Sequence, residues 1–360
     1  MKRLLILEDG SVYEGVGFGG SNYQVGELVF ETGMSGYQET LSDLTYSGQI
    51  IMMTYPLIGN TGINRDDFES LNTAIFGLVV KECCDEPSNF RTTSTLNDFL
   101  TMKDIPGIAD VDTREITRKI RDKGTCKAIM ADENANVAQI VEMLKNAELP
   151  KGLVEKVSTK QAYPVPSRGH KVVLIDNGTK YGVIRELNKR KCDLIVVPFN
   201  MPLEEIMALK PDGVVVSDGP GNPNELKEEI NTIKNLMDAN IPMFGIALGH
   251  QLISIACGAE VEKMKFGHRG HSHPVRNLLT GRVEFTAQNH GYVVSEESIK
   301  NSELEITYKA LNDSTIEGVK HKSLKVFSVQ FNPEGSPGPE DTNYVFDMFN
   351  DNMNLESEVK

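Results

Sequence analysis

The chain has 360 residues, of which 39% are hydrophobic and 24% charged, a balance typical of a globular protein with room for two domains. Its formal net charge of -14, from 51 acidic and 37 basic residues, argues against nucleic acid or anionic membrane surfaces as partners. Five scattered cysteines predict reduced thiols and no segment approaches about 20 consecutive apolar residues, so we expect a cytoplasmic protein that binds small molecules or another protein.

The first part of the chain is predicted to begin as a β-sheet. The pair Asp9-Gly10 lies between two apolar or alternating runs, which indicates a hairpin turn. Residues 112–124 begin with the Asp-x-x-Glu spacing of a capping box, carry isoleucines four residues apart and end in glycine, so we expect a helix there. We assign residues 1–157 to an N-terminal β-containing domain.

The second part of the chain follows a different pattern. Residues 158–170 hold two prolines and few apolar side chains, which suits an interdomain linker. From residue 171 onward, short apolar runs alternate with helical patterns. We therefore predict an α/β domain over residues 171–360 with a mainly parallel sheet, whose functional site lies at the carboxyl ends of the strands.

Two of these predicted strand ends attract attention. The stretch "PMFGIALGHQLI", from Pro242 to Ile253, has the Gly-x-x-x-Gly spacing of a strand-to-helix turn that presents a nucleophile, but the presented residue is Ala247. A tight turn whose small residues only permit close packing is the alternative. The nearby "SDGPGNP" loop contains Gly219 and Gly221, whose backbone N–H groups could bind a polar substrate or an oxyanion, although a plain turn would have the same composition.

Several motifs together resemble a known family. The second part of the chain is similar to the class I (triad) glutamine amidotransferase domain in "SDGPGNP", "FGIALGHQL", "KMKFGHRGHSHPV", "QNHGY" and "FSVQFNPEGSPGP". The first part resembles the small-chain family of carbamoyl phosphate synthase in "LEDGSVYEG", "GELVFETGMSGYQETLSDLTYSGQIIMMTYPLIGNTGIN", "PSNFR" and "GIADVDTREITRKIR". Because other amidotransferases do not share the N-terminal motifs, the resemblance is specific, and it spans nearly the whole chain.

The resemblance implies a division of labour between two chains. The family's small chain hydrolyses glutamine through a cysteine thioester and passes ammonia through a tunnel to a large chain, which makes carbamoyl phosphate from bicarbonate and ATP. The family's nucleophilic cysteine falls on Ala247, its base histidine on Asn332 and its orienting glutamate on Glu334. Thioester chemistry needs a thiolate and a group that takes and returns a proton, so we expect no useful glutaminase activity.

Neither of two other side chains is expected to replace the nucleophile or base. Cys257 lies ten residues beyond Ala247, about 15 Å along a continuous helix. His290 belongs to "QNHGY", a substrate-binding loop in the family. The family usually has asparagine where Asp218 and Ser272 stand, so the polar lining of the site is expected to differ as well.

The residues that match the family's glutamine-binding pattern are better retained. They are Ser47, Gly219, Gly221, Leu248, Gln251, Asn289, Gly291 and Tyr292. Glutamine binding without turnover would explain these residues, and so would the needs of turns and loop hydrogen bonds alone.

Two further motifs are interpreted as structural. His268, His271 and His273 lie within six residues, a spacing that could suit a transition metal, but two of them are usual in the family and we predict no metal site. The glycine-rich "GVGFGG" near the N-terminus resembles a nucleotide-binding loop, but no helix pattern follows it, so we expect a strand hairpin.

The sequence thus predicts a small subunit of carbamoyl phosphate synthase whose own glutaminase step is absent. The expected partners are the large chain and glutamine, with no cofactor in this chain and with ATP and magnesium on the large chain. A non-catalytic glutamine-binding or scaffold protein derived from the family is the alternative from another class. A surviving enzyme with an unrecognised nucleophile is the third.

Overall fold

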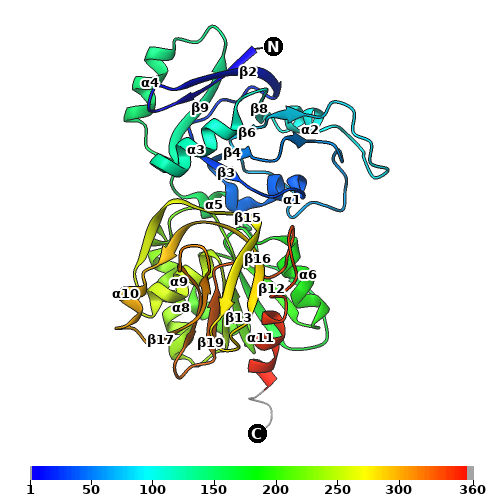
Figure 1. Cartoon of the computed structure of the whole chain (residues 1–360). Helices are drawn as coiled ribbons and strands as arrows, with labels where there is room; N and C mark the ends of the chain where they lie inside the picture. The colour runs from blue at the N-terminus through cyan, green and yellow to red at the C-terminus, as the bar shows by residue number, and fades with distance from the viewer. Residues whose placement is uncertain (1, 355–360) are drawn as a thin grey trace. The chain divides into compact units, whose positions relative to one another are not determined.

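The computed structural model describes residues 2–354, and the ends of the two predicted domains, residue 1 and residues 355–360, lie outside this range. The chain folds into two compact units, Met1–Leu153 and Val154–Lys360. Each unit combines strands with helices, which is the mixed α/β fold that the sequence predicts (Figure 1). The N-terminal unit ends shortly before the predicted boundary at residue 157.

A closed barrel with strand order β1-β2-β8-β6-β4-β3-β9 forms the centre of the N-terminal unit. The barrel strands are β1 (Lys2–Leu7), β2 (Val12–Gly19), β3 (Gly26–Glu31), β4 (Gln49–Met53), β6 (Gly77–Val79), β8 (Pro106–Ala109) and β9 (Cys126–Asp132). Strands β5 (Leu57–Ile58) and β7 (Glu82–Cys83) pair separately. The helices are α1 (Tyr37–Ser42), η1 (Leu44–Tyr46), α2 (Leu96–Met102), α3 (Thr113–Lys123) and α4 (Val137–Asn146).

The local predictions for the N-terminal unit are confirmed. Gly10 has φ 89° in the turn between β1 and β2, and the Ser11 N–H donates to Asp9 Oδ1 at 3.0 Å. The "GVGFGG" stretch is part of strand β2. At the start of α3 the Asp112 carboxylate accepts the Glu115 N–H, whereas the Glu115 carboxylate accepts the Tyr13 hydroxyl at 3.1 Å. The Asp112 half of the predicted capping box is therefore present.

A ten-stranded sheet forms the centre of the C-terminal unit, in the order β10-β12-β11-β13-β14-β19-β18-β17-β15-β16. The run from β12 to β19 is parallel, and the strands on either side of it pair antiparallel. The parallel strands are β11 (Lys171–Asp176), β12 (Asp193–Pro198), β13 (Gly213–Val216), β14 (Met243–Ile246) and β19 (Val326–Val329). The others are β10 (Tyr163–Val165), β15 (Val261–Asn277), β16 (Val283–Val294), β17 (Leu304–Ala310) and β18 (Ile316–His321).

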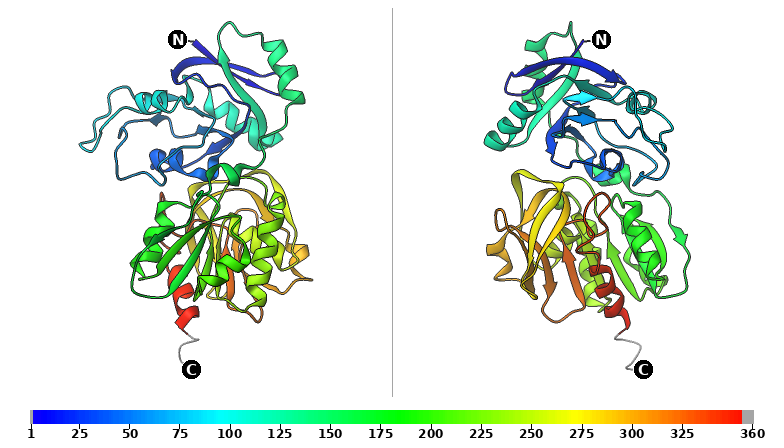
Figure 2. Two further views of the ribbon diagram at one scale, coloured as in Figure 1. Left: turned by 180° about the vertical axis from the view of Figure 1, so that it is seen from behind. Right: turned by 45° about the vertical axis from the view of Figure 1, so that its right-hand side comes forward.

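Helices cover both faces of this sheet because its central strands alternate between two apolar cores (Figure 2). The C-terminal unit contains α5 (Leu153–Val157), α6 (Tyr181–Lys189), α7 (Leu203–Ala208), η2 (Pro223–Glu225), α8 (Lys227–Asp238), α9 (Leu248–Ala256), α10 (Glu296–Ile299) and α11 (Val345–Asn354). Val172 belongs to one core with Leu187 of α6 and Phe346 of α11. Its neighbour Val173 belongs to the other core with Leu252 of α9.

The predicted linker at 158–170 is not a free connection between the units. Its middle forms β10, in which Tyr163 lies opposite Val196 and Val165 opposite Leu194. Pro164 is tolerated because β10 is an edge strand, where a missing N–H leaves no partner unsatisfied. The two prolines that suggested a linker therefore mark the edge of the C-terminal sheet.

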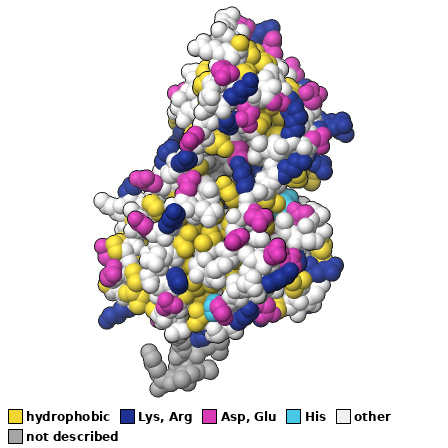
Figure 3. Space-filling model, turned by 90° about the vertical axis from the view of Figure 1, so that its left-hand side faces the viewer, with side chains coloured by type: hydrophobic (Ala, Val, Ile, Leu, Met, Phe, Trp, Pro, Cys, Tyr) yellow, Lys and Arg dark blue, Asp and Glu magenta, His cyan; other side chains and the backbone are white. Residues whose placement is uncertain are grey.

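The surface carries charged side chains of both signs. On the face drawn in Figure 3, acidic and basic side chains are interspersed. Within residues 2–354, every helix is too short or too polar to cross a lipid bilayer.

Candidate active site

Ala247 is the single residue that joins strand β14 to helix α9, and its backbone has φ 48° and ψ −102°. This conformation is rarely adopted by a residue with a Cβ, and it is typical of the strained turn that presents a nucleophile above a sheet. The Ala247 N–H donates to Val329 O of β19 at 2.9 Å, which fixes the turn against the neighbouring strand. The elbow geometry is present, and its presented side chain is a methyl group.

The two glycines of the elbow are required by packing. A Cβ on Gly249 would lie 2.1 Å from Val216 O, and a Cβ on Gly245 would lie 2.7 Å from Gly249 O. Helix α9 therefore crosses the ends of β13 and β14 closer than any side chain allows. The two interpretations of this stretch, a close-packed turn and a nucleophile-presenting elbow, are compatible. The small residues permit close packing, and that packing creates the elbow.

The "SDGPGNP" loop lies beside the elbow. The Gly249 N–H donates to Ser217 O at 3.1 Å, and a Cβ on Gly219 would lie 2.9 Å from the Leu248 side chain. Leu248 is the first residue of α9, so its N–H has no acceptor within the helix. Gly219 and Leu248 therefore lie side by side next to Ala247, and their backbone N–H groups are candidates for an oxyanion hole.

Two other residues of this loop, Gly221 and Asp218, affect its backbone conformation and its charge. Gly221 has φ 94°, which a residue with a Cβ rarely adopts, so glycine is required at this turn. Asp218 is fully buried next to Gly219. A buried carboxyl group therefore lies one residue from a candidate oxyanion-binding N–H.

Asn332 and Glu334 follow β19, the parallel neighbour of β14. Ile246 lies opposite Val329 in the register of these strands, so Ala247 and Asn332 leave the sheet at the same edge. The Asn332 N–H donates to Ala287 O of β16 at 2.9 Å, and Asn332 and Glu334 are both buried. The structure therefore brings the three predicted triad positions to one edge of the sheet.

Glu334 is paired with a lysine that the sequence analysis did not single out. Lys180, at the start of α6, forms an ion pair with Glu334, and only 1% of Lys180 and 4% of Glu334 are exposed. The Lys180 ammonium also donates to Ser336 O at 3.3 Å. Burial, followed by the charges of Lys180 and His273, lowers the pKa of His271 to about 4. A lysine just beyond the carboxyl end of β11 is a signal that could have identified this pair.

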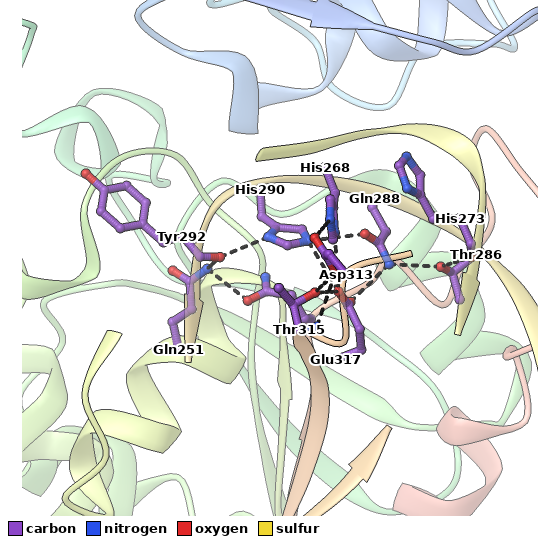
Figure 4. A network of polar contacts seen from close by, with 11 residues as sticks. Gln251, His268, His273, Thr286, Gln288, His290, Tyr292, Asp313, Thr315 and Glu317 are labelled. Carbon is purple, nitrogen blue, oxygen red and sulfur yellow. Dashed lines mark hydrogen bonds and ion pairs between the residues drawn. The ribbon is translucent and has the colours of Figure 1, made fainter. Parts of the chain in front are cut away.

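Five of the residues that match the family's glutamine-binding pattern lie on α9 and β16, namely Leu248, Gln251, Asn289, Gly291 and Tyr292. The Gln251 side chain donates to Tyr292 O at 3.1 Å and to Gln330 Oε1 at 3.0 Å, which holds α9 against β16 (Figure 4). Asn289 lies opposite Arg269 on β15, and a Cβ on Gly291 would come within 3.3 Å of the Arg269 guanidinium. Ser47, which also matches the pattern, belongs to the N-terminal unit, where it is buried after η1.

The fold groups one of the "GHRGHSH" histidines, His268, with residues of two other strands. His268 and His273 stack with ring centroids 5.3 Å apart, but the group of potential metal ligands among residues 2–354 joins His268 to His290 and Glu317 instead. Burial alone would lower the pKa of His268, but hydrogen bonds with Asp313 and Glu317 raise it to about 9. Burial lowers the pKa of His273 to about 4.

Ser272, where the family usually has asparagine, lies within β15 between His271 and His273. In the same strand Arg269 lies opposite Asn289 of β16, so Ser272 and the "QNHGY" residues belong to one pair of antiparallel strands.

Cys257 does not reach the elbow. It caps the opposite end of α9 from Ala247, and burial raises the pKa of its thiol to about 12. Its Sγ contacts Met237 Sδ at 3.8 Å. His290 is also occupied elsewhere, since it hydrogen-bonds Tyr292 O and lies fully within the polar network of Figure 4.

Two protein-family models match the two parts of the chain. The family model for "Glutamine amidotransferase class-I" matches residues 173–352, so the C-terminal unit belongs to the class-I glutamine amidotransferase family. The model for "Carbamoyl-phosphate synthase small chain, CPSase domain" matches residues 5–130. The chain belongs to the carbamoyl phosphate synthase small chain family.

Curated relatives cover nearly the full length of the chain. The pyrimidine-specific small chain of carbamoyl phosphate synthase from Bacillus subtilis is 55% identical over 97% of this chain and 95% of its own. The small chain from Bacillus cereus is 56% identical over the same shares. The pyrimidine-specific small chain from Halalkalibacterium halodurans is 54% identical over 97% of this chain and 96% of its own.

Proposed function

We propose that this chain serves as a carbamoyl phosphate synthase small subunit that does not itself hydrolyse glutamine. The observation that carries the proposal is the elbow at Ala247, where φ 48° and ψ −102° present a methyl group in place of a nucleophile. A thioester cannot form without a thiol at this point, and removal of a nucleophile typically costs several orders of magnitude in rate.

The residues beyond β19 support the same conclusion. The amide of Asn332 neither takes nor returns a proton in the physiological pH range, so it cannot act as a general base. Glu334, which would orient a base, is paired with the Lys180 ammonium. The carboxylate is thus engaged in a buried ion pair.

The loop before Gly219 adds an electrostatic argument. Developing negative charge on a tetrahedral intermediate is stabilised by N–H groups such as those of Gly219 and Leu248. Asp218 is fully buried one residue away, and a carboxylate there would repel an oxyanion. This position therefore works against acyl transfer even if a nucleophile were supplied.

The proposal has a consequence for the assembled enzyme. A large chain bound to this subunit would take free ammonia as its nitrogen source, with ATP and magnesium acting on the large chain. This chain would then act as a scaffold, as a tunnel entrance or as a subunit that responds to glutamine. The positions on α9 and β16, including Gln251 and Tyr292, support glutamine binding without turnover.

The direct test is carbamoyl phosphate formation by this chain assembled with its large chain, with glutamine or ammonium as nitrogen donor. We expect product with ammonium and none above background with glutamine. Product with glutamine, accompanied by equal release of glutamate, would overturn the proposal. Failure of the two chains to co-purify would instead favour a glutamine-binding protein outside the synthase.

Glutamine binding is measured separately by calorimetry on the same chain. A Gln251→Ala variant should lose heat of binding, because its side chain links α9 to the Tyr292 carbonyl. Ala256→Gly, at the far end of the same helix, is the matched control. Equal binding by Gln251→Ala and the parent chain would contradict this part of the proposal.

A further inference from the structure

Four side-chain donor atoms converge between β15, β16 and β18, in a group that the amidotransferase chemistry does not use (Figure 4). One ligand atom each from His268, His290 and Glu317 lies within 4.8 Å of the others, and all three residues are buried. His268 Nδ1 lies 3.3 Å from Glu317 Oε1, and His290 Nε2 lies 3.9 Å from the same oxygen. Gln288 Oε1 lies 3.2 Å from His290 Nε2.

These interatomic distances are similar to the distances between neighbouring ligand atoms around a tetrahedral metal ion. Zinc–nitrogen and zinc–oxygen bonds of about 2.0 to 2.2 Å place neighbouring ligands of a tetrahedron about 3.3 to 3.6 Å apart. The contacts between His268 and Glu317 and between His290 and Gln288 are about this long. The contact between His290 and Glu317 would shorten by a few tenths of an ångström.

Both ring nitrogens of His290 face hydrogen-bond acceptors, and a metal ion bound to one nitrogen would resolve this conflict. Its Nδ1 lies 2.9 Å from Tyr292 O, which can only accept, so Nδ1 carries a proton. Its Nε2 faces Gln288 Oε1, another acceptor. A neutral imidazole carries one proton, so with Nδ1 protonated its Nε2 directs a lone pair at an oxygen.

Rotation of the Gln288 amide does not remove this conflict. Its Nε2 donates to Glu317 Oε2 at 3.0 Å and to Thr286 Oγ1 at 3.1 Å. Turning the amide over would place its oxygen against the Glu317 carboxylate, which is worse. The orientation that satisfies Glu317 is the one that points Gln288 Oε1 at His290.

His268 is oriented in the way that metal-binding histidines are. Its Nε2 lies 2.8 Å from Asp313 Oδ2, so this nitrogen carries a proton and donates it in a hydrogen bond to the carboxylate. Its Nδ1 is buried and lies 3.3 Å from Glu317 Oε1. A carboxylate behind one ring nitrogen, with the second nitrogen directed at another candidate ligand, is the usual arrangement around a protein-bound zinc ion.

The charges of the group are compatible with a divalent cation. Glu317 is fully buried and Asp313 is partly exposed, so two carboxylates face the two rings. A dipositive ion would balance the charges of these two carboxylates. Arg269, which faces His290 from β15, and His273, which stacks on His268, are the nearby groups that oppose a cation.

We propose that His268, His290, Glu317 and Gln288 bind a divalent transition-metal ion of the zinc type in tetrahedral geometry. Asp313 and Tyr292 O hold the two histidines from behind, and Thr315 and Gln288 hold the carboxylate. The ion joins β16 to β15 and β18, beside the Asn289–Tyr292 segment of the substrate loop. Its role is structural, because all four coordination positions are taken by the protein.

The test uses the complete chain, stripped with a chelator and titrated with zinc chloride by calorimetry and with cobalt chloride by visible absorption. We expect one ion per chain and intense cobalt absorption bands of tetrahedral type. Glu317→Gln should weaken zinc affinity at least 100-fold, and Asp313→Asn by about 10- to 100-fold. His273→Asn should bind as the parent chain does.

The variants separate this site from the local histidine motif. If zinc bound through His268, His271 and His273, the His273→Asn variant would lose it and Glu317→Gln would keep it, and the proposal would be wrong. It would also be wrong if the parent chain took up no ion, or gave only the weak cobalt bands of an octahedral site. Should Glu317→Gln fail to fold, the parent cobalt spectrum and the Asp313→Asn affinity decide.

Discussion

Lys180 and Glu334 form an ion pair in the interior of the C-terminal unit, although 153 residues separate them in the chain. The pair connects the start of α6 to the segment after β19, at the edge of the sheet where Ala247 and Asn332 lie. The Glu334 carboxylate neutralises a buried ammonium at this edge. The pair therefore has a stabilising role that can be measured without any substrate.

Breaking this pair should destabilise the chain strongly. Glu334→Gln leaves the Lys180 ammonium buried without a counter-charge, and we expect a loss of about 3 to 5 kcal/mol in the free energy of unfolding, measured by urea denaturation. The double variant Lys180→Met with Glu334→Gln should recover most of the loss. Glu305→Gln, which breaks an exposed pair with Lys320, is the control and should leave the urea midpoint unchanged. Equal midpoints for Glu334→Gln and the parent chain would refute the prediction.

Restoring the missing side chains should restore glutamine hydrolysis. We expect the triple variant Ala247→Cys, Asn332→His and Asp218→Asn to release glutamate, because it supplies a thiol, a base and a neutral oxyanion loop. Ala247→Cys alone should be about 10² to 10⁴-fold slower, the usual contribution of a general base. Glutamate release is measured with a coupled dehydrogenase assay. A folded triple variant as inactive as the parent would mean that Ala247 is not the nucleophile position.

A buried carboxyl group below the Gly219 loop should make stability depend on pH. Burial raises the pKa of Glu229 to about 8, against about 4.5 in an unfolded chain, while the Asn177 amide donates to it at 2.9 Å. A raised pKa in the folded state means that its contribution to stability is complete below about pH 4.5 and is lost as the pH rises to about 8. Glu229→Gln should remove this loss.

The comparison of two urea midpoints tests the Glu229 prediction. Between about pH 5 and about pH 8, the parent chain should lose a few kcal/mol of stability relative to Glu229→Gln. The other groups that titrate in this range, such as Glu31 and His268, are present in both proteins and cancel. Parallel pH profiles for the two proteins would contradict the assignment.

The close crossing of α9 over β13 should tolerate no side chain. A Cβ on Gly249 would meet Val216 O at 2.1 Å, and neither backbone can move independently of its element, so we expect Gly249→Ala to lose about 3 kcal/mol of stability. Gly258→Ala is the matched control, because nothing lies within 4 Å of its Cβ and only its φ of 85° opposes alanine. Thermal unfolding of the two variants gives the comparison, and a smaller loss for Gly249→Ala would show that α9 can shift.

The alternation of strands and helices and the elbow could be predicted from the sequence because both are local. Apolar runs of strand length separated by helical patterns set the parallel part of the sheet, and glycines around Ala247 indicated the turn. The Pro164 segment misled the prediction, since an edge strand and a linker have the same composition.

The polar clusters could not be predicted for a different reason. Lys180 and Glu334 meet only because β11 and β19 end at the same edge of one sheet. His268, His290 and Glu317 come from three strands that pair within one antiparallel region, whereas the sequence suggested neighbouring histidines on a single loop. Side chains brought together by strand order carry no signal in their spacing along the chain.

The backbone at Ala247 has a practical meaning for anyone who modifies this protein. Its conformation is imposed by the contacts of Gly245 and Gly249 and by the bond to Val329 O, none of which involves the side chain at 247. A small reactive side chain installed there would be held at the same exit from the sheet. Because Ala247 is buried, the position suits a group of cysteine size rather than a bulky label.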